Sequence, residues 1–146
     1  MKGVGSMKKD LSRFTDAQKT SYQIALKEIK NGRKTSHWMW YIFPQISGLG
    51  RSSTAQYYAI KNLDEAKEYL KDDYLGNNLR EISKALLDLE TNNAQQIFGN
   101  IDSKKLKSSM TLFGEAGEDS IFQKVLDKFF EGKKDMRTIK ILEMEK

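Results

Sequence analysis

Hydrophobic side chains recur every three or four positions through most of this sequence, which is the spacing of one buried face of an α-helix. The clearest stripe runs from Leu75 to Leu89 and predicts a helix near residues 73–90. Similar stripes predict helices or shorter helical pieces at residues 14–29, 38–43, 53–60, 63–71, 94–98, 103–113 and 121–130. The predicted fold class is therefore all-α, a compact single-domain array of about six to seven helices.

Residues that stop helices lie between several of these stripes. Gly32 suits the end of the first helix. Pro44 is expected to end the aromatic helix, because a proline pushes the residue before it out of helical geometry. The piece at residues 94–98 is expected to end at Gly99. The tail, residues 136–146, fits either a short helix or a strand.

Residues that start helices are equally visible. Ser52 or Ser53 is a typical N-cap for the helix at residues 53–60, and Asn62 is one for the helix that follows. Asp102 or Ser103 is expected to cap the helix at residues 103–113.

Composition favours a soluble, cytoplasmic protein. The 146 residues are 38% hydrophobic and 31% charged, and they show neither a repeat nor a linker. There is no cysteine, which fits a reducing compartment, and the longest apolar run is far shorter than the roughly 20 residues that cross a bilayer. A second methionine follows MKGVGS, so we expect residues 1–6 to be a vector-derived leader and residues 7–146 to form the single helical domain.

Charge is unevenly distributed along the chain. The formal net charge is +5, but residues 1–61 carry +8 and residues 62–146 carry −3. No acid occurs between Ile29 and Leu63. This asymmetry fits an anionic partner for the first half, and it fits equally a basic lobe that faces an acidic lobe within one fold.

The most unusual segment is SHWMWYIFPQISGLGRSS, residues 36–53. It holds both tryptophans and the single histidine and proline of the chain. One histidine without cysteine makes a zinc site very unfavourable, so no metal is expected. The chain has no G-x-S-x-G elbow, P-loop or dinucleotide fingerprint, so no cofactor is expected either.

Anion binding is the chemistry that this segment still supports. Gly48, Gly50 and Arg51 precede a helix that begins near Ser52, where free backbone N–H groups favour a phosphate or carboxylate. Trp38 or Trp40 could stack on a ring, and Gln45 or His37 could orient it. The alternative is that both tryptophans belong to the core and that the glycines only turn the chain.

Two further features are open to a functional and a structural interpretation. His37 is the only natural acid–base group at neutral pH, although a lone histidine among aromatic residues is more often structural. In the stretch KKLKSSMTLF, residues 104–113, three lysines, Lys105 among them, lie beside Ser108, Ser109 and Thr111. These side chains could bind an anion, or they could lie on an amphipathic helix with a solvated basic face.

These features lead to one geometric prediction, that His37, Arg51 and residues 108–111 converge on a single pocket. Arg51 has no acid near it in sequence. Its guanidinium must therefore face solvent, a ligand, or a distant carboxylate such as Glu81 or Glu115.

The motifs HWMW-IFPQ, GLG-S and KL-SSMTLF resemble a bacterial family, the domain of unknown function 1810, which is sometimes mislabelled calpastatin. The resemblance covers nearly all of residues 11–130 and leaves out the leader and the tail after Glu131. It implies a mostly helical single domain and no particular activity. Its motif positions are His37, Trp38, Trp40, Pro44, Gln45, Gly48, Gly50, Arg51, Ser52, Lys105, Ser108, Ser109, Met110, Thr111 and Phe113.

Three functions compete on these observations. The first is a binding domain for a small anionic ligand, with nucleotides among the candidates. The second is a metal-independent enzyme that uses His37 as its acid–base group. The third is a basic module for nucleic acid or protein, built on Lys30, Arg33, Lys34 and Lys61. No recognised nucleic-acid motif is present, so nucleic acid is the least favoured partner.

Overall fold

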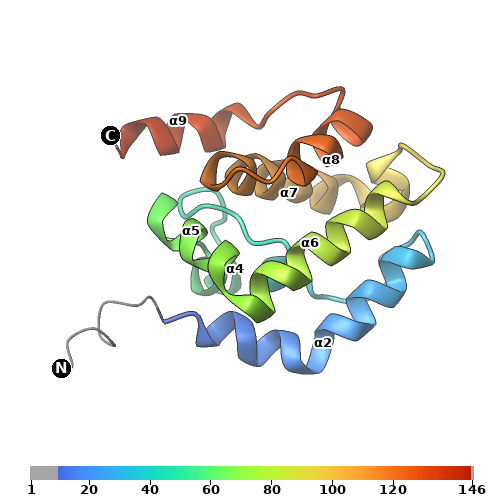
Figure 1. Ribbon diagram of the computed structural model, residues 1–146, viewed down its shortest axis with the longest axis horizontal. Helices are drawn as coiled ribbons and strands as arrows, with labels where there is room; N and C mark the ends of the chain where they lie inside the picture. The colour runs from blue at the N-terminus through green and yellow to red at the C-terminus, as the bar shows by residue number, and fades with distance from the viewer. Residues whose placement is uncertain (1–9, 146) are drawn as a thin grey trace.

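The computed structural model describes residues 10–145, and within them the chain is helical with no strand. The eight helices of this part are α2 (Ser12–Lys30), α3 (Met39–Ile42), α4 (Ser53–Tyr58), α5 (Leu63–Lys71), α6 (Asp73–Leu87), α7 (Ala94–Ala116), α8 (Ile121–Phe130) and α9 (Met136–Met144) (Figure 1). The all-α prediction is confirmed, and the expected six to seven helices were too few. The leader, residues 1–6, lies outside the described residues.

Side-chain caps account for most of the helix starts. Ser52 accepts a hydrogen bond from the Ala55 N–H at 3.1 Å, and Asn62 accepts one from the Glu65 N–H at 2.9 Å. Asp135 starts α9 in the same way, by accepting from the Thr138 N–H at 3.1 Å. Such caps satisfy backbone donors that a helix leaves free, and each contributes about 1 kcal/mol. The cap at Asp135 is the local reason that the ambiguous tail is a helix.

The stop predicted at Gly99 is confirmed, because α7 consists of two helical pieces that meet at this residue. Gly99 has φ 82°, which interrupts the helical geometry, but the helix resumes at once. The expected cap at Asp102 or Ser103 is therefore wrong. Ser103 lies within the helix, and its hydroxyl donates to the Asn100 carbonyl at 2.9 Å.

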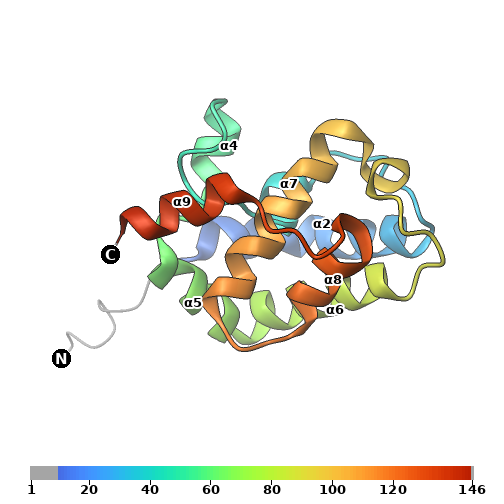
Figure 2. The same cartoon turned by 90° about the horizontal axis from the view of Figure 1, so that it is seen from above.

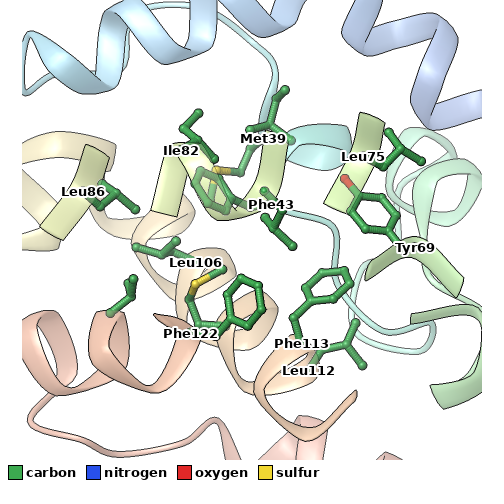
Figure 3. Close-up of a cluster of buried hydrophobic side chains, with 14 of the residues drawn as sticks. Met39, Phe43, Tyr69, Leu75, Ile82, Leu86, Leu106, Leu112, Phe113 and Phe122 are labelled. Carbon is green, nitrogen blue, oxygen red and sulfur yellow. The ribbon is translucent and has the colours of Figure 1, made fainter. Parts of the chain in front are cut away.

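The core forms where α7 meets the other helices. α5, α8 and α9 pack against α7, and α6 packs against α2, α5 and α8 (Figures 1 and 2). Figure 3 shows Tyr69 of α5, Phe113 of α7 and Phe122 of α8 in one cluster. All three side chains are fully buried. Burying a side chain of this size contributes about 1.5–3 kcal/mol, so this cluster fixes the position of α7.

None of the helices in the described part of the chain has the length and hydrophobicity that crossing a bilayer requires.

Candidate functional site

Glu28 of α2 holds the turn at residues 35–38. Its carboxylate accepts from the Thr35 N–H at 2.7 Å, from the Ser36 N–H at 3.0 Å, from the Ser36 hydroxyl, and from the Trp38 indole N–H at 2.9 Å. Partial burial would raise the pKa of Glu28, but the hydrogen bonds from Ser36, Thr35 and Trp38 outweigh it and lower this pKa to about 2. The turn is thus built around a carboxylate that is charged at neutral pH.

Trp38 is a core residue, so its assignment as a ligand-binding residue was wrong. Its side chain is 1% exposed, and its single donor is used by Glu28. Lys34 lies over its ring at 5.1 Å and pairs with Asp102 at 3.0 Å. Lys34 therefore belongs to the packed structure and not to a free basic face.

Trp40 is the tryptophan that reaches the surface. It is partly buried, and the Lys105 ammonium lies 5.2 Å from the centre of its ring. Lys105 also lies 3.6 Å from Asp102, the carboxylate that Lys34 already shares. One carboxylate thus faces two ammonium groups, so the positive charge of this cluster is only partly neutralised.

The 43–52 loop, which follows α3, is held against the rest of the fold at two places. An isolated parallel bridge pairs Ile46 with Ile60, with hydrogen bonds of 2.8 Å on either side. At Gly50 a Cβ would lie 2.5 Å from the Cβ of Ala55, so only glycine allows this approach to α4. Gly48 has φ 107°, and a Cβ there would lie 3.4 Å from the Ile141 side chain of α9. Gly50 is therefore required by packing, whereas Gly48 is required by its positive φ.

This loop forms one wall of a groove of about 370 Å³. The middle of α7 and the start of α9 form the other walls. We call it the basic groove, and its lining residues are Gln45, Leu49, Gly50, Lys104, Lys105, Lys107, Ser108, Asp135 and Arg137. Four of these side chains are cationic and one is a carboxylate. Among the described residues, Lys105 alone of the four cations forms an ion pair, at 3.6 Å.

The hydroxyls of the SSMT segment connect α7 to the start of α9. Ser108 donates to the Lys104 carbonyl at 3.1 Å and lies 3.2 Å from an Asp135 oxygen. The Thr111 hydroxyl donates to the Lys107 carbonyl at 2.8 Å and accepts from the Asp135 N–H, also at 2.8 Å. Ser108 reaches the groove, whereas Thr111 is buried and supports its wall.

The predicted convergence of His37, Arg51 and Ser109 is wrong. Ser109 is 0% exposed, and its hydroxyl has no partner among the described residues. His37 and Arg51 are exposed, and neither lines the basic groove. The reason is local. Trp38 points inward from the Glu28 turn and leaves His37 outside, and the tight contact of Gly50 with Ala55 places Arg51 beyond the groove. Ser52 is exposed as well and serves as the cap of α4.

The distant acids proposed for Arg51 have other partners. Glu81 accepts from the Tyr22 hydroxyl at 2.6 Å, and Glu115 pairs with Lys134 at 2.7 Å. Within residues 10–145 Arg51 forms no ion pair, so its charge faces solvent.

Sequence reasoning missed three groove residues, namely Leu49, Asp135 and Arg137, whereas the three lysines of residues 104–107 belonged to a cluster that it considered for anion binding. Asp135 and Arg137 lie in the tail, whose structure the hydrophobic pattern left open. Asp135 is a typical N-cap residue, and that signal would have indicated the start of α9.

A second hollow lies further along α9. This acidic cavity measures about 350 Å³ and is lined by Leu63, Asp64, Glu115, Ile139, Leu142, Glu143 and Glu145. Glu145 accepts from the Leu63 N–H at 3.0 Å. Within residues 10–145, no three histidine or carboxylate side chains gather closely enough to hold a metal ion.

The fold and the groove together define a class, a small helical domain with a basic groove between a glycine-containing loop and two helices. The chain belongs to the family described as Protein of unknown function (DUF1810), whose model matches residues 8–142. The match extends beyond Glu131, so the tail that completes the groove belongs to the family domain.

One solved structure is similar over nearly the whole chain. It is the crystal structure of the conserved hypothetical protein Rv1873 from Mycobacterium tuberculosis, at 1.38 Å. The two chains are 41% identical with a TM-score of 0.90, over 92% of this chain and 96% of that one. A comparison with curated proteins finds no match.

Proposed function

We propose that the basic groove binds a small anionic ligand. The observation that carries the proposal is that four cationic side chains, Lys104, Lys105, Lys107 and Arg137, line one hollow. Three of them form no ion pair within the described residues, and the fourth shares its carboxylate with Lys34. Gathering like charges without neutralising them is unfavourable unless solvent or a ligand compensates.

The shape of the groove supports a small ligand. A volume of about 370 Å³ suits a molecule of the size of a nucleotide or smaller, rather than a polymer. Gln45 and the Ser108 hydroxyl add neutral polar groups at its surface, which favour orientation over charge attraction alone.

The proposal is tested by titrating the protein with inorganic phosphate and with AMP, followed by NMR chemical shifts. In the wild-type protein we expect shifts that cluster at the 43–52 loop and at residues 104–108. Lys104→Gln combined with Arg137→Gln should weaken binding about tenfold, because each exposed cation contributes up to about 1 kcal/mol at low salt. Both side chains are exposed, so the fold should be retained.

A matched control is Lys19→Gln, which removes an exposed lysine on α2. It should leave the affinity unchanged. Shifts that follow the net charge alone, with Lys19→Gln as damaging as the groove variants, would contradict a specific site. So would the absence of shifts with either probe.

The two alternatives have less support. An enzyme with His37 as its acid–base group needs this imidazole beside a binding site, and His37 does not line the groove. A nucleic-acid interface on the first half of the chain loses Lys34 to its ion pair with Asp102. We therefore expect no specific DNA or RNA binding at physiological salt, which electrophoretic mobility shifts would check.

A further inference from the structure

Asp135 is the one carboxylate among the lining residues of the basic groove, and the fold holds it firmly. Its Oδ2 atom accepts from the Thr138 N–H at 3.1 Å and from the Thr138 hydroxyl at 2.6 Å. It also lies 3.2 Å from the Ser108 hydroxyl, whose one proton it shares with the Lys104 carbonyl. Its own N–H donates to the Thr111 hydroxyl at 2.8 Å. These bonds connect α7 to α9 and fix the carboxylate at the groove surface.

All three donors use the same oxygen. The other oxygen, Oδ1, has no hydrogen-bond partner within residues 10–145, and Ser109 alone holds a buried side-chain polar atom without a partner in that range. Oδ1 is therefore open to the groove. None of the four groove cations lies within ion-pair distance of Asp135 among the described residues.

A fixed negative charge is a disadvantage to a site for bare anions, because it repels them. The same charge is an advantage if the ligand carries a hydroxyl beside its anionic group. An ionised carboxylate accepts strong hydrogen bonds from such a donor. The neighbouring Gln45 side chain, which has no hydrogen bond among the described residues, can bond a second hydroxyl.

We infer that Asp135 Oδ1 is a hydroxyl-recognition point, and that the ligand class is a hydroxylated phosphate, such as a sugar or polyol phosphate. This inference rests on the proposed function of the basic groove. The cations bind the phosphate, Asp135 selects for the hydroxyl next to it, and simple phosphates bind less well.

Two probes of equal charge and length isolate the hydroxyl. Glycerol 3-phosphate carries two hydroxyls, and propyl phosphate carries the same three carbons without them. Calorimetric titration of the wild-type protein should give an affinity for glycerol 3-phosphate about tenfold above that for propyl phosphate, the size of one hydrogen bond to a charged group.

Asp135→Asn should act on the two probes in opposite directions. Asparagine caps a helix about as well as aspartate, so α9 should stay folded. Losing the carboxylate should weaken glycerol 3-phosphate binding about fivefold or more. Propyl phosphate should bind about two- to threefold more tightly, because a repelling charge is gone. A purely structural role for Asp135 would weaken both probes alike, and that outcome would overturn the inference.

Thr138→Val is the control for the support of Asp135. It removes one donor to Oδ2 and leaves Oδ1 and its charge in place, so the preference for glycerol 3-phosphate should persist. Equal affinity of the wild-type protein for both probes would overturn the hydroxyl inference and leave the proposed function intact. Failure of both probes to bind would reject the proposed function and this inference with it.

Discussion

The basic groove and the acidic cavity border the same helix, α9, and differ in how their charges are used. Two of the four acids of the cavity have partners within the fold, since Glu115 pairs with Lys134 and Glu145 accepts from the Leu63 N–H. Three of the four cations of the groove have no ionic partner among the described residues. Glu115 and Glu145 of the cavity therefore contribute to holding the structure together, whereas Lys104, Lys107 and Arg137 of the groove have no such role within residues 10–145.

The charges of α9 show the same difference. A helix favours acids in its first turn and bases in its last turn, by about 0.3–1 kcal/mol each. α9 has Arg137 near its start and Glu143 near its end, which is the reverse. The stability of α9 does not explain this arrangement. Arg137 lines the basic groove and Glu143 lines the acidic cavity, so each charge lies at the hollow of its own sign.

The largest expected effect comes from weakening the packing of α9, the helix that borders both hollows. Leu142 is the buried hydrophobic residue of α9 and lines the acidic cavity. Leu142→Ala should lower the free energy of unfolding by about 2–4 kcal/mol, as buried leucines generally do. Urea denaturation measures this loss. Met144→Ala, at an 80% exposed position, is the control and should stay within about 0.5 kcal/mol of wild type. Equal stability of the two variants would mean that α9 is not anchored by Leu142.

Lowering the pH should destabilise the fold through Glu28, which holds the turn at residues 35–38. The pKa of this carboxyl, about 2, lies below its ordinary value of 4.5. Its contribution to stability is therefore complete above about pH 4.5 and is lost as the pH falls toward 2. Glu28→Gln should remove about 1–3 kcal/mol at pH 7, the size of hydrogen bonds to a charged acceptor.

Denaturation curves of wild type and Glu28→Gln between pH 2 and 7 check both statements. The difference in stability between the two proteins should shrink as the pH falls. A constant difference over this range would mean that the hydrogen bonds to Glu28 do not depend on its charge. Glu90→Gln is a matched control at an exposed position, and it should change little at any pH.

Reversing one charge in each hollow tests whether only the basic groove binds phosphate. Lys107→Glu in the basic groove should weaken inorganic phosphate binding about tenfold, since it removes an attraction and adds a repulsion. Glu143→Lys in the acidic cavity changes the net charge of the protein by the same amount in the opposite sense. It should not create a second phosphate site. NMR titration would contradict the comparison if Glu143→Lys produced new shifts at α5 and the end of α9.

The smallest effect is expected at Arg51. This side chain is exposed and lies outside the groove, so Arg51→Ala should change stability by less than about 0.5 kcal/mol. Phosphate affinity should change less than about twofold, because this exposed charge does not line the groove and is screened by solvent. A tenfold loss of affinity would instead mean that Arg51 contacts the ligand and that the binding site extends toward α4.

The sequence was sufficient to predict the helices that carry long apolar stripes, such as α2 and α6. It also supplied the caps at Ser52 and Asn62, because a cap depends on residues three positions away. The two tryptophans were harder to assign. Which of them turns inward depends on Glu28, ten residues before Trp38 and on another helix, and no local pattern reports that contact.

The basic groove was predicted only in part. Gln45, Gly50, Lys105 and Ser108 were named from the loop and from the SSMT segment, and the fold does bring these four together. Asp135 and Arg137 were missed because their place in the groove depends on how α9 packs on α7. Polarity alone also misassigned Ser109, whose hydroxyl lies in the core.

The position of α9 in the chain has a consequence for synthesis. Nearly all buried hydrophobic residues lie before Phe130, and a growing chain emerges from the ribosome with its N-terminal part first. Asp135 and Arg137 follow only after those core residues have been made. The nascent protein therefore gains most of its hydrophobic interior before α9 can complete the basic groove.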